Sequence, residues 1–200
     1  MSNGKGIIRM FTCFCLPKVA PLIPYPSVSA EPYQGAGILF LEGPVALAGI
    51  QKHRQVVKGS VEPRLSGFGG RREDQDIDWV HTAFRETIEE LFGVDGVSVS
   101  LVQLLRSKVP YRASFKTGEY WVLQSTFEDL KTLLLIASKH LQSPLYSRMP
   151  LTLEELITRR HPQSISEIGA LALVPVSSPY VDVAFTEDLK KATGATGATA

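Results

Sequence analysis

The segment between residues 69 and 94 constrains the fold more than any other part of the chain. An acidic stretch ends at Asp78, whose carboxylate can accept the free backbone N–H groups at the start of a helix. Apolar side chains then recur with the 3.6-residue period of one helix face, and Gly93 follows where a left-handed stop is expected. The positions on this face are Val80, Ala83, Phe84, Thr87, Ile88 and Leu91. The pattern predicts a helix that packs on a core with one face and carries polar groups on the other.

The polar face of this predicted helix carries three carboxylates. Glu86 lies three and four residues before Glu89 and Glu90, and these offsets place neighbours on one side of a helix. Such carboxylates repel one another unless a divalent cation lies between them, and Mg²⁺ and Mn²⁺ prefer oxygen ligands. Gly69 and Gly70 precede the helix and would let the backbone approach a metal or a phosphate closely. A solvated acidic face is the alternative interpretation.

The remaining elements predict an α/β (α+β) domain. Two short apolar runs at 37–41 and 45–50 are separated by Gly43-Pro44, which predicts a hairpin. We expect further strands at 97–105, 120–126 and 170–176, helices at 128–141 and 152–160, a loop or strand end at 51–59, and a loop at 66–78. There are too few helices between these strands for a doubly wound sheet, so a mixed sheet flanked by helices is favoured.

The chain is expected to contain one domain with two extensions. Residues 1–32 carry five prolines and are interpreted as an N-terminal extension. Residues 33–190 would form the domain, with a helical insertion at about 128–160. Residues 191–200 are a low-complexity tail.

Composition excludes several classes of protein. With 21 Lys and Arg against 20 Asp and Glu, the net charge of +1 argues against a global electrostatic grip on nucleic acid. Cys13 and Cys15 are too few for a disulfide framework or a structural zinc site. No apolar run reaches the length of about 18 residues expected for a membrane span, and a cytoplasmic location is predicted. The four histidines share no metal-binding spacing, and His81 is expected at the surface.

The segment Arg85-Glu86-Thr87-Ile88-Glu89-Glu90, preceded by Gly69-Gly70, resembles the signature of the Nudix hydrolases. The strand expected at 35–41 and the sequence Ser166-Glu167-Ile168 before a late strand are also similar to that family, and the resemblance covers roughly residues 33–185. It implies a Nudix-like mixed sheet sandwiched between helices and a pyrophosphohydrolase that depends on Mg²⁺ or Mn²⁺.

The resemblance also implies a role for individual residues. Glu89 and Glu90 would bind the metal, and Glu86 would be a further ligand or the general base toward water. Arg85 would hold the glutamates by ion pairing, and the carbonyl of Gly70, or of Gly69, would be an additional ligand. The remaining candidates are Glu167 as a metal-binding or basic glutamate, Arg71 and Arg72 as phosphate contacts, and Glu73 and Asp76 as further acidic residues.

The spacing departs from the family pattern in the loop before the helix. The family has glutamate eight residues before the arginine, and this chain has Ile77 at that distance from Arg85. The same glutamate lies six residues after the family's glycine, and this chain has Asp76 at that distance from Gly70. Either the loop is one residue longer or the first acidic position is lost. The departure keeps two alternatives open, a catalytically inactive Nudix-like module that binds a nucleotide or RNA, and a structural protein with an accidental acidic helix.

The sequence does not specify the substrate. The expected substrate is a nucleoside diphosphate linked to another group, such as a nucleotide sugar or a dinucleoside polyphosphate; a diphosphoinositol is an alternative. The basic residues of the helical insertion could face RNA, so an mRNA cap is also possible. These residues are Lys131, Lys139, Arg148, Arg159 and Arg160.

Overall fold

The computed structural model describes residues 32–57, 60–161 and 166–194. The predicted N-terminal extension, with Cys13 and Cys15, lies outside the described residues except for Pro32, as do residues 195–200 of the predicted tail. The described elements are β1 (Gly35–Glu42), β2 (Val45–Val57), β3 (Ser60–Ser66), β4 (Phe68–Arg71), α1 (Trp79–Phe92), α2 (Val99–Lys108), β5 (Ala113–Thr117), β6 (Tyr120–Ser125), α3 (Phe127–His140), α4 (Leu153–Thr158), β7 (Ile168–Pro175) and α5 (Val183–Thr193).

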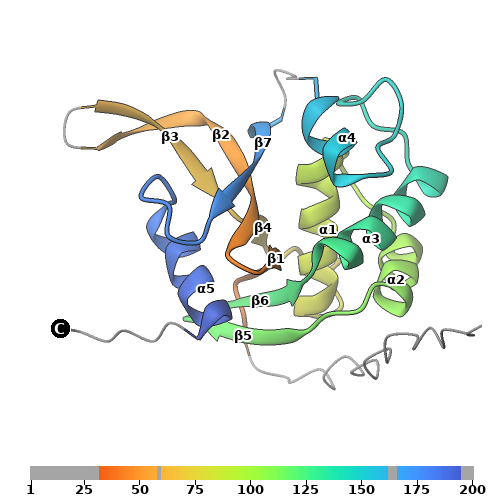
Figure 1. Cartoon of the computed structure of the whole chain (residues 1–200). Coiled ribbons are helices and arrows are strands. Elements are labelled where there is room, and N and C mark those ends of the chain that lie inside the picture. The colour runs from red at the N-terminus through yellow and green to blue at the C-terminus, as the bar shows by residue number, and fades with distance from the viewer. Residues whose placement is uncertain (1–31, 58–59, 162–165, 195–200) are drawn as a thin grey trace, which may run out of the picture.

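Strand β1 lies at the centre of a mixed seven-stranded sheet (Figure 1). The order is β3-β2-β1-β6-β5, with β4 also paired to β1 and β7 also paired to β2. The β1–β6 pair is parallel, and the other strand pairs are antiparallel. This confirms the α+β class and the mixed sheet, and it places the glycines of β4 directly beside β1.

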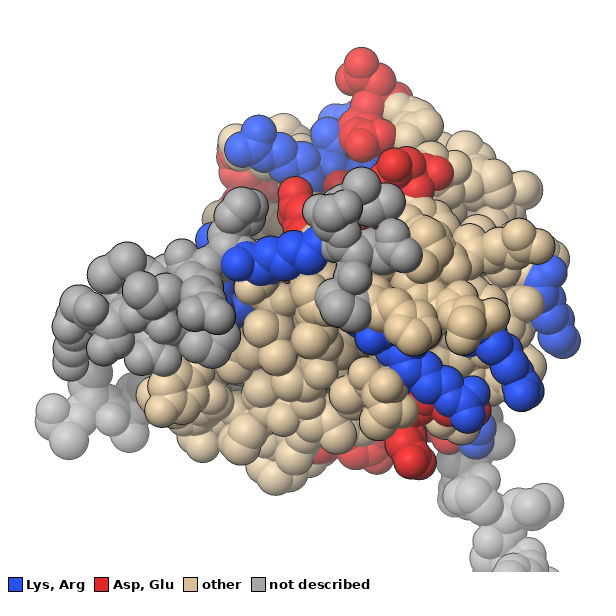
Figure 2. Space-filling model, turned by 90° about the horizontal axis from the view of Figure 1, so that it is seen from above, with Lys and Arg blue, Asp and Glu red and all other residues tan. Residues whose placement is uncertain are grey.

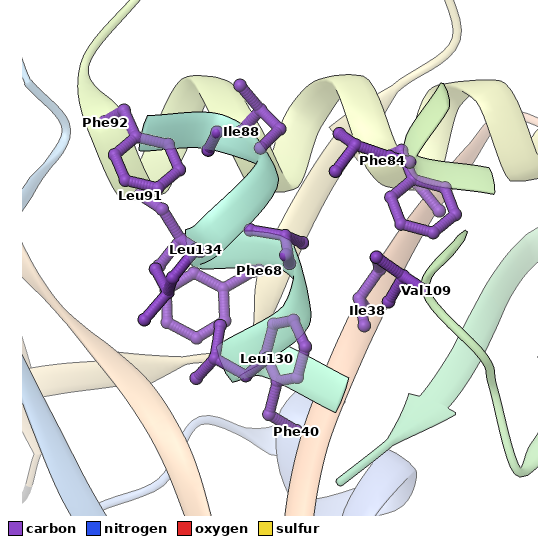
Figure 3. Close-up of a cluster of buried hydrophobic side chains, with 14 of the residues drawn as sticks. Ile38, Phe40, Phe68, Phe84, Ile88, Leu91, Phe92, Val109, Leu130 and Leu134 are labelled. Carbon is purple, nitrogen blue, oxygen red and sulfur yellow. The ribbon is translucent and has the colours of Figure 1, made fainter. Parts of the chain in front are cut away.

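Helices cover the sheet on both sides (Figure 1). Helices α1, α2 and α3 enclose the larger apolar cluster, where side chains from β1, β4, α1 and α3 converge (Figure 3). A second cluster forms between the other side of β1 and helix α5, which contributes Phe185 and Leu189. Because α1 uses Val80, Ala83, Phe84, Ile88 and Leu91 for the larger cluster, its carboxylate face is turned away from that cluster.

The prediction of a strand at 97–105 is wrong, because this segment enters helix α2 at Val99. Ser98 caps the helix by accepting a hydrogen bond from the Leu101 N–H at 3.3 Å. Leu101, Val102 and Leu105 then bury one face of the helix. In a short valine-rich run, this helical spacing is hard to distinguish from that of a buried strand.

Strands and a helix also form where loops or tails are expected. Strand β2 continues to Val57 and pairs with β3, so most of 51–59 is strand. The glycine segment forms β4, and β5 pairs with β6. Helix α5 runs to Thr193, three residues into the predicted tail. In the described part of the chain, no helix is both long and apolar enough to span a membrane.

Candidate functional site

Helix α1 provides the acidic face of the candidate site, and its two ends are fixed by local interactions. The Asp78 carboxylate accepts from the His81 N–H at 2.7 Å and from Arg106 at 2.5 Å. At the other end Gly93 adopts a left-handed conformation (φ 62°), which glycine reaches without steric cost. Both ends lie where the sequence predicts them.

Arg85 is completely buried beside Glu86 and Glu89, although it lies on the same helix. Its Nη1 atom is 2.9 Å from Glu89 Oε2, and its Nη2 atom is 3.0 Å from Glu86 Oε1. Nη2 also donates to the carbonyl of Arg71 at 2.8 Å. Burial opposes the charge of Arg85, but the surrounding carboxylates outweigh burial and raise its pKa. The guanidinium therefore stays charged and fixes two carboxylates relative to β4.

Asp76 is the main counter-ion of Arg85, a role the sequence does not assign to it. Its two oxygens accept from Nε and Nη2 of Arg85, each at 2.9 Å, in a bidentate pair. They also accept from His81 Nδ1 at 2.9 Å and from Thr82 Oγ1 at 2.8 Å. Among the described residues, the other donor to Asp76 is the Glu73 N–H, so the structure places this acidic candidate in a buried ion-pair cluster beside the site.

The loop before α1 turns two successive side chains in opposite directions. Asp76 is buried, whereas Ile77, one position later, is 58% exposed. The loop therefore places its buried carboxylate at Asp76, nine residues before Arg85. The expectation of a surface His81 is wrong, since Asp76 holds its ring in the interior.

Gly69 and Gly70 of β4 lie directly against the glutamates. The Gly69 N–H donates to Glu90 Oε2 at 2.7 Å. A Cβ atom added to Gly70 would overlap the Glu86 carboxylate, so the missing side chain creates the space which that carboxylate occupies. Gly69 has φ 150°, a conformation that L side chains rarely adopt. The glycines therefore form a strand edge that β1 holds and the carboxylates approach, whereas the sequence predicts a loop here.

Partial burial limits the solvation of the carboxylates of Glu86, Glu89 and Glu90. Burial raises the pKa of Glu86 to about 7, with Arg85 acting in the opposite direction. Burial also raises the pKa of Glu90 to about 8, although the hydrogen bond from Gly69 lowers it. The pKa of Glu89 is raised in the same way. Each of these groups would gain from a nearby cation that stabilises its charged form.

The three glutamates open into one cavity of about 520 Å³, named here the acidic cavity. Gly69, Gly70, Arg71 and Glu167 also line it. Glu167 is exposed and comes from the segment before β7, far from α1 in the sequence. The structure thus brings together the predicted residues Glu86, Glu89, Glu90, Gly70, Arg71 and Glu167.

Two further predicted residues do not line the acidic cavity. Arg72 lies over the Tyr33 ring, with its guanidinium carbon 4.9 Å from the ring centre. Glu73 is half-exposed and contributes only a long contact of 3.4 Å to Arg85. Neither residue lines the acidic cavity, so the expected phosphate contact of Arg72 has no support from the geometry.

The donor set of the acidic cavity fits a hard divalent cation in part. Carboxylate and carbonyl oxygens are the ligands that Mg²⁺ and Mn²⁺ prefer, and Gly70 leaves room for the Glu86 carboxylate beside the backbone. Among the described residues, no three His, Cys, Asp or Glu side chains are grouped closely enough to hold a metal by themselves. A Mg²⁺ ion commonly takes only one or two carboxylates and fills its shell with water and substrate phosphate.

Arg160 connects the last turn of α1 to the start of β7 from inside the protein. It donates to the carbonyls of Leu91 at 2.6 Å, Glu90 at 2.9 Å and Ile168 at 3.0 Å. The expectation that Arg160 could face RNA is therefore wrong, because its side chain is buried and used. No sequence signal identifies this role, since all three acceptors are backbone atoms and those of Leu91 and Glu90 lie 69 and 70 residues away in the sequence.

Of the other basic residues of the predicted insertion, Lys139 and Arg148 line one cavity, and Arg159 and Lys131 lie beside glutamates. Arg159 pairs with Glu155 at 2.8 Å, and Lys131 lies 3.6 Å from Glu128. On the face that Figure 2 shows, Lys and Arg side chains are separated by uncharged areas and by acidic side chains. This distribution gives no support to an extended RNA-binding surface on that face.

Comparison with known proteins gives little further guidance. No protein-family model matches the chain, and no curated protein matches it. One similar solved structure is a hydrolase of the NUDIX family from Clostridium perfringens, with 8% identity and a TM-score of 0.35, covering 84% of this chain and 99% of that one. A TM-score this low does not establish a common fold, so the functional interpretation depends on the geometry around Arg85.

Proposed function

We propose that this chain is a metal-dependent hydrolase of the Nudix type that cleaves a diphosphate bond in a nucleoside diphosphate linked to another group. The observation that carries the proposal is the acidic cavity, where three glutamates of one helix meet the glycine backbone of β4 over a buried arginine. An acidic helix face that is only solvated would not require a buried arginine such as Arg85 beneath it, or the glycine backbone of β4 beside it.

Each residue then has a defined task. Glu89 and Glu90, together with the carbonyl of Gly70, would hold Mg²⁺ or Mn²⁺, and a divalent ion held there would supply neutralisation of the charge on the diphosphate oxygens. Glu86, whose burial raises its pKa to about 7, is suited to take a proton from the attacking water near neutral pH. Arg85 orients Glu86 and Glu89, Arg71 contacts a phosphate oxygen, and Glu167 is a second basic or ligating carboxylate.

The test is hydrolysis of a substrate panel with Mg²⁺ or Mn²⁺. The panel contains nucleotide sugars, dinucleoside polyphosphates, capped RNA, diphosphoinositols and nucleoside triphosphates. We expect cleavage that needs the metal, that Glu89→Gln reduces at least about a hundredfold, and that Glu128→Gln leaves unchanged. Glu128 is the matched control because its side chain is 76% exposed on α3. Cleavage of the whole panel at equal rates by Glu89→Gln would remove the basis of the proposal.

A catalytically inactive module that binds a nucleotide or RNA is the second candidate. It is favoured by the absence, among described residues, of a ready three-side-chain metal group. Calorimetry of Mg²⁺ and Mn²⁺ binding separates the two candidates. Metal binding without turnover of any panel member, by a folded protein, would favour the binding module, as would nucleotide binding without metal.

A further inference from the structure

A second cavity, of about 920 Å³, lies at the end of α3, on the segment 141–151 that leads from it to α4 (Figure 1). We name it the α3 cavity. It shares no lining residue with the acidic cavity, and none of the residues given a task in the proposed reaction lines it. A ligand of the α3 cavity would therefore bind separately from the proposed reaction.

The charged side chains that line the α3 cavity are basic. Lys139 and His140 come from the last turn of α3, and Arg148 comes from the segment beyond it. All three are exposed, and no acidic residue lines the cavity among the described residues. Glu155, which is close enough to feel the charge of Arg148, lies outside the lining. The cavity therefore presents two positive charges, and protonation of His140 adds a third.

These basic side chains are not neutralised by ion pairs within the described part of the chain. None of the three has a carboxylate at ion-pair distance there, whereas Lys131, on the same helix, lies 3.6 Å from Glu128. The negative end of the α3 dipole accounts for Lys139 and His140. It does not account for Arg148, which belongs to a different segment. Unpaired cations from two segments around one space indicate an anionic ligand.

Other residues hold the walls of the α3 cavity in place. Ser143 Oγ donates to the Phe92 carbonyl at 2.5 Å and accepts from the Leu145 N–H at 3.0 Å. The buried Tyr146 donates from its hydroxyl to the carbonyl of Leu156 at 2.9 Å. These bonds anchor the segment to α1 and α4. A ligand therefore meets a wall that is already ordered, which saves the free energy that ordering it would cost.

We propose that the α3 cavity binds a compact ligand that carries two or more clustered phosphate groups. Lys139 and Arg148 pair with the phosphates, and His140, Gln142 and Ser147, which also line the cavity, donate hydrogen bonds to them. A single phosphate would be held weakly, because solvent screens each exposed charge pair. Clustered phosphates engage both cations at once. Free polyphosphates and phosphorylated lipid headgroups share this chemistry.

Binding of inorganic tripolyphosphate to the metal-free protein tests the proposal independently of hydrolysis. We would titrate the folded protein and follow by NMR the backbone signals of residues 138–151 and those of Gly69 and Gly70. We expect tripolyphosphate to shift the first group and to leave the two glycines unchanged, because the acidic cavity repels an anion when no metal is bound. Inorganic phosphate should bind at least about tenfold more weakly, and added salt should weaken both.

Exposed lysines on one helix provide a matched control. Lys139→Gln and Arg148→Gln should each weaken tripolyphosphate binding about fivefold, whereas Lys131→Gln, on α3 but outside the cavity, should not. Lys139→Glu and Lys131→Glu change the net charge equally. A loss of binding confined to Lys139→Glu therefore separates the cavity from the overall field of the protein.

Vesicles distinguish the two sources of clustered phosphates. Sedimentation of the protein with phosphatidylcholine vesicles only when they contain phosphatidylinositol bisphosphate, and its loss in Arg148→Gln, would assign a lipid headgroup. Tripolyphosphate binding without vesicle binding would assign a free ligand. The proposal is overturned if neither probe binds, or if the Lys139 and Arg148 variants weaken binding no more than the matching Lys131 variants do.

Discussion

Four carboxylates surround the buried guanidinium of Arg85, and their ion pairs with it differ greatly in burial and distance. They belong to Glu73, Asp76, Glu86 and Glu89. Asp76 is fully enclosed and bidentate, whereas Glu73 is half-exposed and 3.4 Å away. The spacing of the glutamates on α1 is readable from the sequence because helix geometry fixes it. The pairing with Asp76 is not readable in the same way, because the path of the seven-residue loop 72–78 decides which of several acidic residues turns inward.

Asp76 and Glu73, two acidic partners of Arg85, should contribute very differently to the free energy of unfolding. Asp76→Ala leaves the Arg85 charge buried with less compensation and should lower the free energy of unfolding by about 3–5 kcal/mol. Glu73→Ala, at a half-exposed position, should cost less than about 1 kcal/mol. Urea unfolding at pH 7 measures both. Equal losses for the two variants would show that Asp76 is not the main counter-ion.

Strand β4 approaches helix α1 closely where Gly70 faces the Glu86 carboxylate. In Gly70→Ala the new methyl group would meet the end of the Glu86 side chain, which can swing aside without disturbing the backbone. We expect kcat/KM on the best substrate to fall about a hundredfold while the melting temperature stays nearly unchanged. Gly169→Ala is the control, since the nearest atom to its methyl group would belong to the flexible Lys52 side chain, at 3.3 Å, and the Ile50 carbonyl oxygen would be at 3.7 Å, an ordinary contact. A fully active Gly70→Ala variant would argue against a catalytic position for Glu86.

The link between α1 and β7 through Arg160 gives a second element-scale prediction. Arg160→Ala removes a donor from three backbone carbonyls, of which Ile168 keeps the hydrogen bond from Ser166 Oγ, and should reduce the free energy of unfolding by about 2–4 kcal/mol. Arg159→Ala removes an exposed pair with Glu155 and should cost less than about 1 kcal/mol. Denaturant unfolding of the two neighbouring variants compares them directly, and similar losses would contradict the buried role.

At this scale the sequence predicts long amphipathic helices better than short segments. Helix α1 lies where its apolar period and caps place it. Helix α2 and strand β5 are short, so their apolar runs do not distinguish a strand period from a helix period. The pairing of β4 with β1 requires the whole sheet, and no local pattern encodes it.

For the whole molecule, the raised pKa values of the site make stability depend on pH. In the folded chain the pKa of Glu86 is about 7 and that of Glu90 about 8, against 4.5 for an ordinary glutamate. Between pH 4.5 and 8 the folded state thus binds more protons than the unfolded state, and stability falls as pH rises.

Without divalent metal, we expect the free energy of unfolding to fall by about a few kcal/mol between pH 5 and pH 8. Mg²⁺ should restore part of this loss at pH 8, because it stabilises the charged glutamates. Glu90→Gln should flatten the dependence. Urea titrations at four pH values check this prediction, and a metal-free protein that is more stable at pH 8 than at pH 5 would contradict it.

The central position of β1 also shapes how the chain folds while it is being synthesised. Seven of its eight residues are buried, and its long-range neighbours are β4, which begins at Phe68, and β6, which begins at Tyr120. Synthesis proceeds from the N-terminus, so β1 leaves the ribosome well before the strands that will flank it. Until residue 125 has emerged, this apolar segment has one free edge and is a target for chaperones and for misassociation. A nascent chain stalled before β6 should therefore remain protease-sensitive even though more than half of its length has been made.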